Sequence, residues 1–163
     1  MSAGARPSDC LVPGRIADHT SCLLIKLGQA AYRLQEARLA ALDLRVRHFS
    51  VLQGLADEGP IVQLELARHL RIDPATMAAA LDHLERLGAV VRTRSEKDKR
   101  RYVVRLSSSG GDLLARAQAA VGSVDEVLAA DLDGAAAQLK ALLARLGASA
   151  GLAEAYETAG GAA

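Results

Sequence analysis

The sequence has few aromatic residues: it contains no tryptophan, one phenylalanine and three tyrosines among 163 residues. This excludes a core built mainly of aromatic rings, so leucine, valine and alanine must supply most of the buried surface. Because alanine and leucine are among the strongest helix formers, the composition favours a mainly helical fold. A chain of this length corresponds to about one ordinary domain, which is large enough to bury a hydrophobic core.

Cysteines are also few, and the uncharged apolar runs are short. Cys10 and Cys22 do not make a disulfide framework, and no CxxC or paired-histidine spacing indicates a zinc site. No apolar run approaches the length of a transmembrane helix, and residues 1–14 lack an apolar segment of signal-peptide length. We therefore expect a cytoplasmic protein that needs no metal or other cofactor and does not enter a membrane.

The sequence lacks the patterns that most enzymes need. It has no serine or cysteine nucleophile set with histidine and a carboxylate, and no glycine-rich loop that would hold a phosphate. The glycines lie mainly at predicted helix ends and near the ends of the chain. We therefore do not expect an enzyme.

Positive charge is concentrated in the middle of the chain, although the net charge is only +1. Residues 60–106 contain ten basic and six acidic residues, a net charge of +4, whereas residues 1–59 carry +1 and residues 107–163 carry −4. A basic segment suits a polyanion such as nucleic acid, which the acidic segment would repel. The charge distribution therefore predicts that the middle of the chain binds nucleic acid.

Helical periodicity covers most of the first half of the sequence. Apolar residues recur every three or four positions over about 17–42, resume at Phe49 and stop at Gly59-Pro60. The next segment, 61–70, is predicted as a third helix. Its inward-facing residues are expected to be Leu64, Ala67 and Leu70.

A fourth helix is predicted from Pro74 to Leu87, because Asp73 can cap its start and Gly88 can end it in the left-handed conformation. Helical spacing turns three of its residues toward the core, namely Met77, Leu81 and Leu84. Two segments rich in β-branched residues follow, 89–94 and 102–106, and predict a β-hairpin. Helical periodicity then returns after Ser107, is interrupted at 131–134 and continues from 135 to about 156.

A helix, a short turn, a second helix and a β-ribbon, in this order, predict a winged helix-turn-helix. The second helix is narrow enough to enter the major groove of DNA, and the tip of the ribbon reaches the minor groove or the backbone. Residues 92–101, at this tip, include six basic and two acidic residues. The predicted fold class is therefore mainly α with a small β-hairpin wing, an α+β arrangement.

We expect the chain to divide into two functional parts. Residues 46–106 form the winged module, and residues 17–45 and 107–157 form a helical dimerisation region. The apolar stripes of that region exceed what the winged module needs, and a two-fold DNA site requires a symmetric dimer, although an intramolecular core could use the same stripes. Residues 1–16 and 158–163 are rich in small residues and are expected to be disordered tails.

Three stretches of the sequence resemble the MarR family of transcription factors, the multiple antibiotic resistance regulators. The helix-turn-helix of that family resembles GPIVQLELARHLRIDPATM, and its recognition helix, wing and fifth helix resemble LDHLERLGAVVRTRSEKDKRRYVVRLSSSGGDLL. Its wing signature, D-x-R-[R/S]-x-x-x-x-L-[T/S], is matched from Asp98 to Ser107. The resemblance covers roughly residues 20–150. It implies a homodimeric repressor of a pseudo-palindromic DNA site, released by a small effector such as an aromatic or anionic molecule.

The expected DNA contacts come from the predicted fourth helix and from the wing. The resemblance implies that Asp98 holds Arg100 for insertion into the minor groove, where a narrow groove favours arginine. Helical spacing turns five residues toward the major groove: Ala75, Thr76, Ala78, Ala79 and His83. Alanine can contact only a thymine methyl group, so we expect specificity to depend on the wing and on DNA shape. The expected wing and backbone contacts are Arg71, Arg92, Arg94, Lys97, Asp98, Lys99, Arg100 and Arg101, with Arg86 as a further phosphate contact.

Two features are candidates for the release of DNA. Arg45, Arg47 and His48 could bind a carboxylate or phenolate, or they could form a solvated polar cluster. Cys22 lies near the start of the first helix with a histidine three residues before it and a lysine four residues after it, which suits a peroxide-sensing thiol. The alternative for Cys22 is a small buried residue at a helix interface.

One alternative of another class remains, a non-catalytic helical protein-interaction module whose DNA binding has degenerated. The alanine-rich fourth helix makes this alternative conceivable. The two readings differ in their salt dependence, because only a DNA-binding protein releases counterions from phosphates when it binds.

Overall fold

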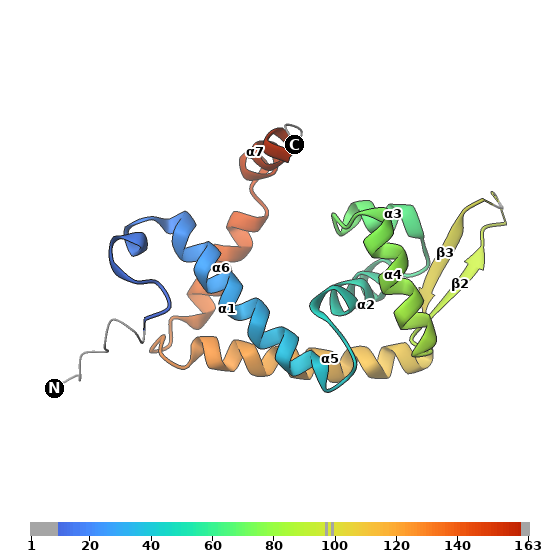
Figure 1. The fold of residues 1–163 in the computed structure, drawn as a ribbon, viewed down its shortest axis with the longest axis horizontal. Helices are drawn as coiled ribbons and strands as arrows, with labels where there is room; N and C mark the ends of the chain where they lie inside the picture. Colours follow the sequence, from blue (N-terminus) through green and yellow to red (C-terminus); the bar gives the residue numbers. More distant parts are fainter. Residues whose placement is uncertain (1–9, 97, 99, 161–163) are drawn as a thin grey trace. The chain divides into compact units, whose positions relative to one another are not determined.

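The computed structural model describes residues 10–96, 98 and 100–160, which form a mainly helical fold with one small β-sheet (Figure 1). Its elements, in chain order, are the 3-10 helix η2 (Gly14–Asp18), α1 (Thr20–Ala40), α2 (Val46–Glu58), β1 (Ile61–Val62), α3 (Gln63–His69), α4 (Pro74–Arg86), β2 (Val90–Arg94), β3 (Tyr102–Leu106), α5 (Ser108–Ala129), α6 (Ala136–Gly147) and α7 (Ala150–Gly160). The predicted fold class is confirmed. Of the two predicted disordered tails, residues 1–9 and 161–163 lie outside the described residues. The described parts of both tails contain helical residues, since η2 begins at Gly14 and α7 ends at Gly160.

The chain divides into two compact units, one up to Val124 and the other from Asp125 onward. The hydrophobic core belongs to the first unit and takes side chains from α1 to α5 and from β2 and β3. Met77, Leu81 and Leu84 of α4 are fully buried there, as predicted. The expectation for Leu64 is wrong, because its side chain is 41% exposed. Ala67 is buried as predicted, together with Leu66, and Leu70 is partly buried against the core.

The ends of α4 follow directly from the local sequence. The Asp73 carboxylate accepts a hydrogen bond of 2.9 Å from the Thr76 amide, and Pro74 occupies the first helical position, where its missing N–H costs nothing. After the helix, Gly88 adopts a φ of 70°, in the left-handed region that glycine enters at little cost. These residues place α4 at a fixed position between the turn after α3 and the wing.

The sheet has three antiparallel strands in the order β1-β3-β2. Strand β2 pairs with β3 from Val90 opposite Leu106 to Arg94 opposite Tyr102, and this ribbon is the predicted hairpin. The short strand β1 pairs with β3 through Ile61 opposite Val104. The predicted helix over 61–70 is therefore wrong in its first two residues, which belong to the sheet.

The start of α5 is fixed against the turn between α4 and β2. The hydroxyls of Ser107 and Ser109 both donate hydrogen bonds to the Gly88 carbonyl, at 2.6 and 2.8 Å. Ser107 also caps α5, since its hydroxyl accepts a hydrogen bond from the Gly110 amide. Gly110 lies so close to Ala89 that a Cβ at this position would be 1.9 Å from the Ala89 carbonyl oxygen. The base of the wing is thus attached firmly to α5.

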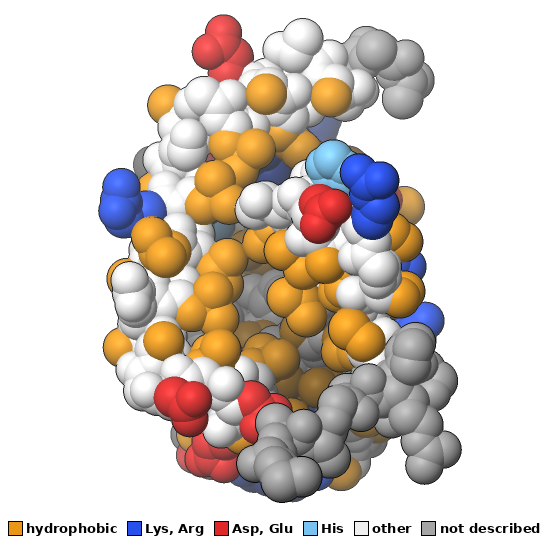
Figure 2. All heavy atoms as spheres, turned by 90° about the vertical axis from the view of Figure 1, so that its left-hand side faces the viewer, with side chains coloured by type: hydrophobic (Ala, Val, Ile, Leu, Met, Phe, Trp, Pro, Cys, Tyr) orange, Lys and Arg blue, Asp and Glu red, His pale blue; other side chains and the backbone are white. Residues whose placement is uncertain are grey.

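The second unit contains the end of α5 together with α6 and α7. The helix predicted from 135 to about 156 is interrupted, because Ala148 and Ser149 separate α6 from α7. The exposed leucines of α6 are Leu139, Leu142, Leu143 and Leu146. Figure 2 shows that many hydrophobic side chains reach the surface on the face that it draws. None of the helices in the described part of the chain has the length and apolarity that crossing a membrane requires.

Candidate nucleic-acid interface

The outer face of α4 carries most of the residues predicted to read DNA. Ala75 and Ala79 are exposed, and Thr76 and Ala78 are half-buried, whereas the opposite face of the helix is buried in the core. In the turn before α4, Arg71 is exposed and adopts a φ of 52°, a left-handed conformation that reverses the chain between α3 and α4. Over residues 75–79 the outer face of α4 therefore presents mainly alanine methyl groups, and Thr76 is the one residue of this stretch with a hydrogen-bonding side chain.

His83 differs from these residues because its side chain is engaged within the protein. Its Nε2 atom lies 2.7 Å from the Asp43 carbonyl oxygen, and its Nδ1 atom lies 3.1 Å from a guanidinium nitrogen of Arg86. The imidazole also stacks on that of His48, with ring centroids 4.4 Å apart. His83 thus ties α4 to the turn between α1 and α2, and its prediction as a base contact does not fit these contacts.

The proposed ligand cluster is not one open site. The Nδ1 atom of His48 accepts a hydrogen bond from the Arg45 amide, and the imidazole is buried. The guanidinium of Arg45 is exposed and pairs with Glu36 at 3.0 Å, and Arg47 is also exposed. Burial, with help from the neighbouring His83 and Arg47, lowers the pKa of His48 to about 4. His48 is therefore neutral near pH 7 and poorly suited to attract an anion.

The tip of the wing carries exposed arginines. Arg94 lies over the Tyr102 ring at 5.9 Å, a cation–π contact between β2 and β3. The Asp98 carboxylate pairs with the Arg101 side chain at 3.3 Å, while Arg100 donates only its backbone amide to Asp98. Asp98 therefore organises the turn but does not hold the Arg100 guanidinium, contrary to expectation. The other two wing residues of the prediction lie outside the described residues, namely Lys97 and Lys99.

Arg92, which was predicted to contact phosphate, is occupied by two carboxylates of α4. Its Nη2 atom donates to Asp82 at 2.6 Å and to Glu85 at 2.6 Å, and its Nε atom donates to Glu85 at 3.0 Å. The Arg92 side chain is only 21% exposed. Hydrogen bonding to Glu85, with a further contribution from Asp82, raises the pKa of Arg92, so the guanidinium stays charged.

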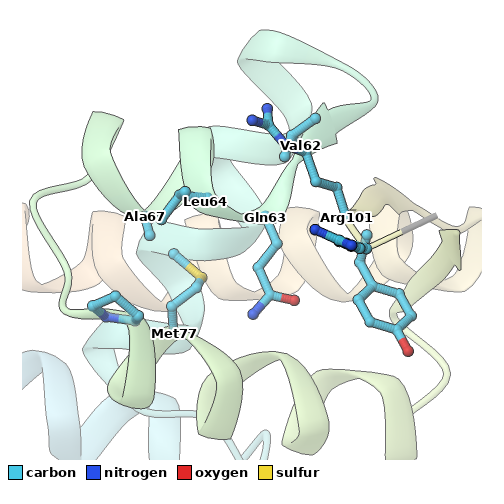
Figure 3. A pocket seen from close by; sticks show the side chains of 9 residues that line it. Val62, Gln63, Leu64, Ala67, Met77 and Arg101 are labelled. Carbon is cyan, nitrogen blue, oxygen red and sulfur yellow. The ribbon is translucent and has the colours of Figure 1, made fainter. Parts of the chain in front are cut away.

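A pocket of about 220 Å³ lies between α3, the start of α4 and the wing (Figure 3). Figure 3 shows Gln63 between Met77 and Arg101, among the side chains that line this pocket. Its complete lining is Val62, Gln63, Leu64, Ala67, Pro74, Met77, Arg100, Arg101 and Tyr102. Sequence reasoning missed this pocket because its walls come from segments that are distant along the chain.

Cys22, the predicted redox residue, is half-buried in the first turn of α1, and Cys10 is exposed. Both are free cysteines. Within residues 10–160, apart from 97 and 99, no group of three or more histidine, cysteine or acidic side chains is placed to hold a metal ion. The redox role of Cys22 stays a prediction.

Comparison with known proteins gives consistent matches. The model of the MarR family matches residues 44–102. The HTH-type transcriptional repressor Rv2887 of Mycobacterium tuberculosis is 32% identical over 126 residues, which cover 77% of this chain and 91% of the relative. The structure of the transcriptional repressor CouR bound to a 23-mer DNA duplex has a TM-score of 0.71 and 32% identity, covering 82% of this chain and 94% of that one. CouR from Rhodococcus jostii RHA1 bound to p-coumaroyl-CoA has a TM-score of 0.65 and 27% identity, covering 78% and 91%.

Proposed function

The chain belongs to the MarR family of winged helix-turn-helix transcriptional regulators, and from this premise we propose that it is a homodimeric repressor of a pseudo-palindromic DNA site. Membership also confirms the prediction that the chain is not an enzyme. The observation that carries the proposal is that α4 lies beside the wing (Figure 1), and that Ala75 and Ala79 of α4 and the arginines at the wing tip are exposed. A small effector releases the repressor from its site.

The surface of α4 supports a particular division of labour in DNA recognition. Ala75 and Ala79 can make apolar contact with thymine methyl groups but cannot read a hydrogen-bond pattern. The exposed Arg100 is suited to a narrow minor groove, whose negative potential attracts a guanidinium. In this proposal, α4 sets the position on the duplex, and the wing and DNA shape supply most of the specificity.

Exposed apolar side chains support dimerisation. A monomeric protein rarely leaves large contiguous apolar patches in water, and two-fold DNA sites require two wings. On α1 the exposed apolar side chains include Leu24, Ile25, Leu27 and Tyr32. In the second unit, α6 separately exposes four leucines, and α7 exposes Leu152 and Tyr156. We assign these two surfaces to the contact with the partner subunit.

A small aromatic or anionic molecule is the proposed effector. CouR binds p-coumaroyl-CoA, an aromatic acyl thioester with anionic phosphates, and this supports an aromatic or anionic effector here. Of the three basic residues predicted to meet such a ligand, Arg47 is the one with an exposed side chain free of a described partner. Release of the protein from DNA by aromatic acids and their CoA thioesters, followed by fluorescence anisotropy, tests this class of effector.

The wing is tested with Arg100→Ala and with Arg33→Ala, which removes the same charge from the exposed surface of α1. Binding is measured to the DNA upstream of the protein's own gene and to a random duplex of equal length. Arg100→Ala should weaken binding to the upstream DNA by about 1–3 kcal/mol, the usual scale for an arginine that reads DNA, and weaken random binding much less. Equal losses on both duplexes would remove the assigned role of Arg100 in specificity.

A further inference from the structure

The Arg92 cluster, defined as Arg92 with Asp82 and Glu85, joins the two elements that the proposed function brings into neighbouring grooves of DNA. Asp82 and Glu85 are three residues apart on one face of α4, and Arg92 extends from β2 between their carboxylates. Three hydrogen bonds of 2.6 to 3.0 Å connect them. The cluster therefore connects the recognition helix to the wing by side chains rather than by the backbone alone.

The geometry of the cluster leaves Arg92 little freedom to reach DNA. Its guanidinium uses the Nε and Nη2 donors on the two carboxylates, and its side chain is much less exposed than that of Asp82, at 21% against 61%. A guanidinium that turned toward a phosphate would leave two carboxylates without a counterion on the helix that approaches the DNA. The negative charges of these two carboxylates and of the DNA phosphates would then repel each other.

We expect the angle between α4 and the wing to depend on the Arg92 cluster, because the backbone connects them only by a short turn. Only the turn through Gly88 connects the two elements in sequence, whereas the other strand of the ribbon, β3, pairs with β1 and contacts α2 and α3. Because these contacts are made by β3, the angle between β2 and α4 can still change about the turn at Gly88. A fork of hydrogen bonds from Arg92 to two positions of α4 restrains this motion.

We propose that Arg92 is a positioning residue, which fixes the wing relative to the recognition helix by holding Asp82 and Glu85 and does not contact a DNA phosphate. This replaces the expectation that Arg92 clamps the backbone. The inference rests on the proposed DNA-binding function and adds to it the residues that set the spacing between helix and wing. Asp82 and Glu85 thereby become determinants of DNA binding, although both are acidic.

The test is a double-mutant cycle between Arg92→Ala and the neutral pair Asp82→Asn/Glu85→Gln. Binding is measured to the upstream DNA and to random duplex, and hydroxyl-radical footprinting reports the minor-groove protection given by the wing. Positioning predicts that the neutral pair weakens upstream binding, on the order of fivefold, and reduces wing protection, although it removes two negative charges. A phosphate contact by Arg92 predicts the opposite sign, because fewer negative charges and a released arginine strengthen binding.

The combined variant gives the second criterion. If Arg92 acts through the two carboxylates, Arg92→Ala causes little further loss once they are neutral, and the slope of log K against log salt stays nearly unchanged. Full additivity, with a slope smaller by about 0.9 for each lost phosphate contact, overturns the inference. Asp125→Asn/Glu126→Gln, which removes two exposed charges from the end of α5, is the matched control and should not reduce wing protection.

Failure of this inference and failure of the proposed function give different results. A wild-type protein that prefers its upstream DNA, combined with an additive cycle, removes the positioning role alone. A wild-type protein without that preference removes the proposed function, and the positioning role with it. Circular dichroism and thermal unfolding of each variant establish that the variants are folded, so a loss of binding reports on the interface.

Discussion

Acid should destabilise the protein through His48, which packs at the junction of α1, α2 and α4. The imidazole is buried, accepts a hydrogen bond from the Arg45 amide and stacks on His83. A proton on Nδ1 would break the bond to Arg45, and the added charge would be poorly solvated beside a second imidazole. Asp43 and Glu36 on neighbouring segments partly offset this cost, and Arg47 increases it.

The size and the sign of the effect follow from the pKa. Burial, first, and the nearby His83 and Arg47 lower the pKa of His48 from 6.5 to about 4. Between these values the unfolded chain binds a proton that the folded chain does not, so the free energy of unfolding falls with falling pH. Each pH unit costs about 1.4 kcal/mol, so the contribution is complete above pH 6.5 and about 3 kcal/mol is lost by pH 4.

The assay is urea unfolding between pH 4 and pH 8, followed by circular dichroism at one fixed protein concentration, because dimerisation makes stability depend on concentration. His48→Asn keeps an acceptor close to the position of Nδ1 and has no titrating group. Between pH 8 and pH 4 the wild type should lose about 3 kcal/mol more than His48→Asn. His19→Asn, which removes an exposed histidine, is the matched control. A difference between wild type and His48→Asn that does not change with pH would refute the assignment.

Two further predictions concern the first unit. Gly110→Ala should destabilise the protein by about 1–3 kcal/mol in urea unfolding, because the added Cβ meets the Ala89 carbonyl. Gly111→Ala, in open space on the same helix, should instead stabilise it by about 0.5–1 kcal/mol. A change of the same sign in both variants would contradict this packing. Glu36→Ala should cost about 1–3 kcal/mol, because it leaves the Val46 amide without its 2.8 Å hydrogen bond, and Glu36→Gln, which keeps an acceptor, should cost less in the same assay.

Elements with strong local signals were predictable from the sequence. Asp73-Pro74 and Gly88 mark the ends of α4, and the structure confirms the helix within one residue. The segments rich in β-branched residues on either side of the charged tip predicted β2 and β3, because such residues favour strands. Each of these signals acts over a few residues, where the preference of one residue type decides the conformation of the backbone.

Features that depend on distant contacts were not predictable. Strand β1 has two residues and exists because Ile61 and Val62 pair with β3, about forty residues later in the chain. Its helical appearance in the sequence comes from the leucines that follow it. The exposure of Leu64 has the same origin, because the helix starts only after the strand and its buried face begins at Leu66.

The candidate site shows the same limit at the level of single side chains. The face of α4 could be predicted from helical spacing, but the partners of its polar residues could not. His83 binds a carbonyl forty positions earlier, and Arg92 binds carboxylates seven and ten positions earlier. The sequence around a basic residue does not show whether the residue pairs with a DNA phosphate or with a carboxylate of the same chain.

The most direct test of the account is the salt dependence of binding to the DNA upstream of the protein's own gene. A winged-helix dimer that places its wing in the minor groove and other basic residues on phosphates should bind this DNA more tightly than a random duplex. Its association constant should fall linearly on a log–log plot, with a slope of about −4 or steeper, which corresponds to four or more phosphate contacts. Equal affinity for both duplexes together with a slope near zero would contradict the assignment of this chain as a sequence-specific DNA-binding repressor.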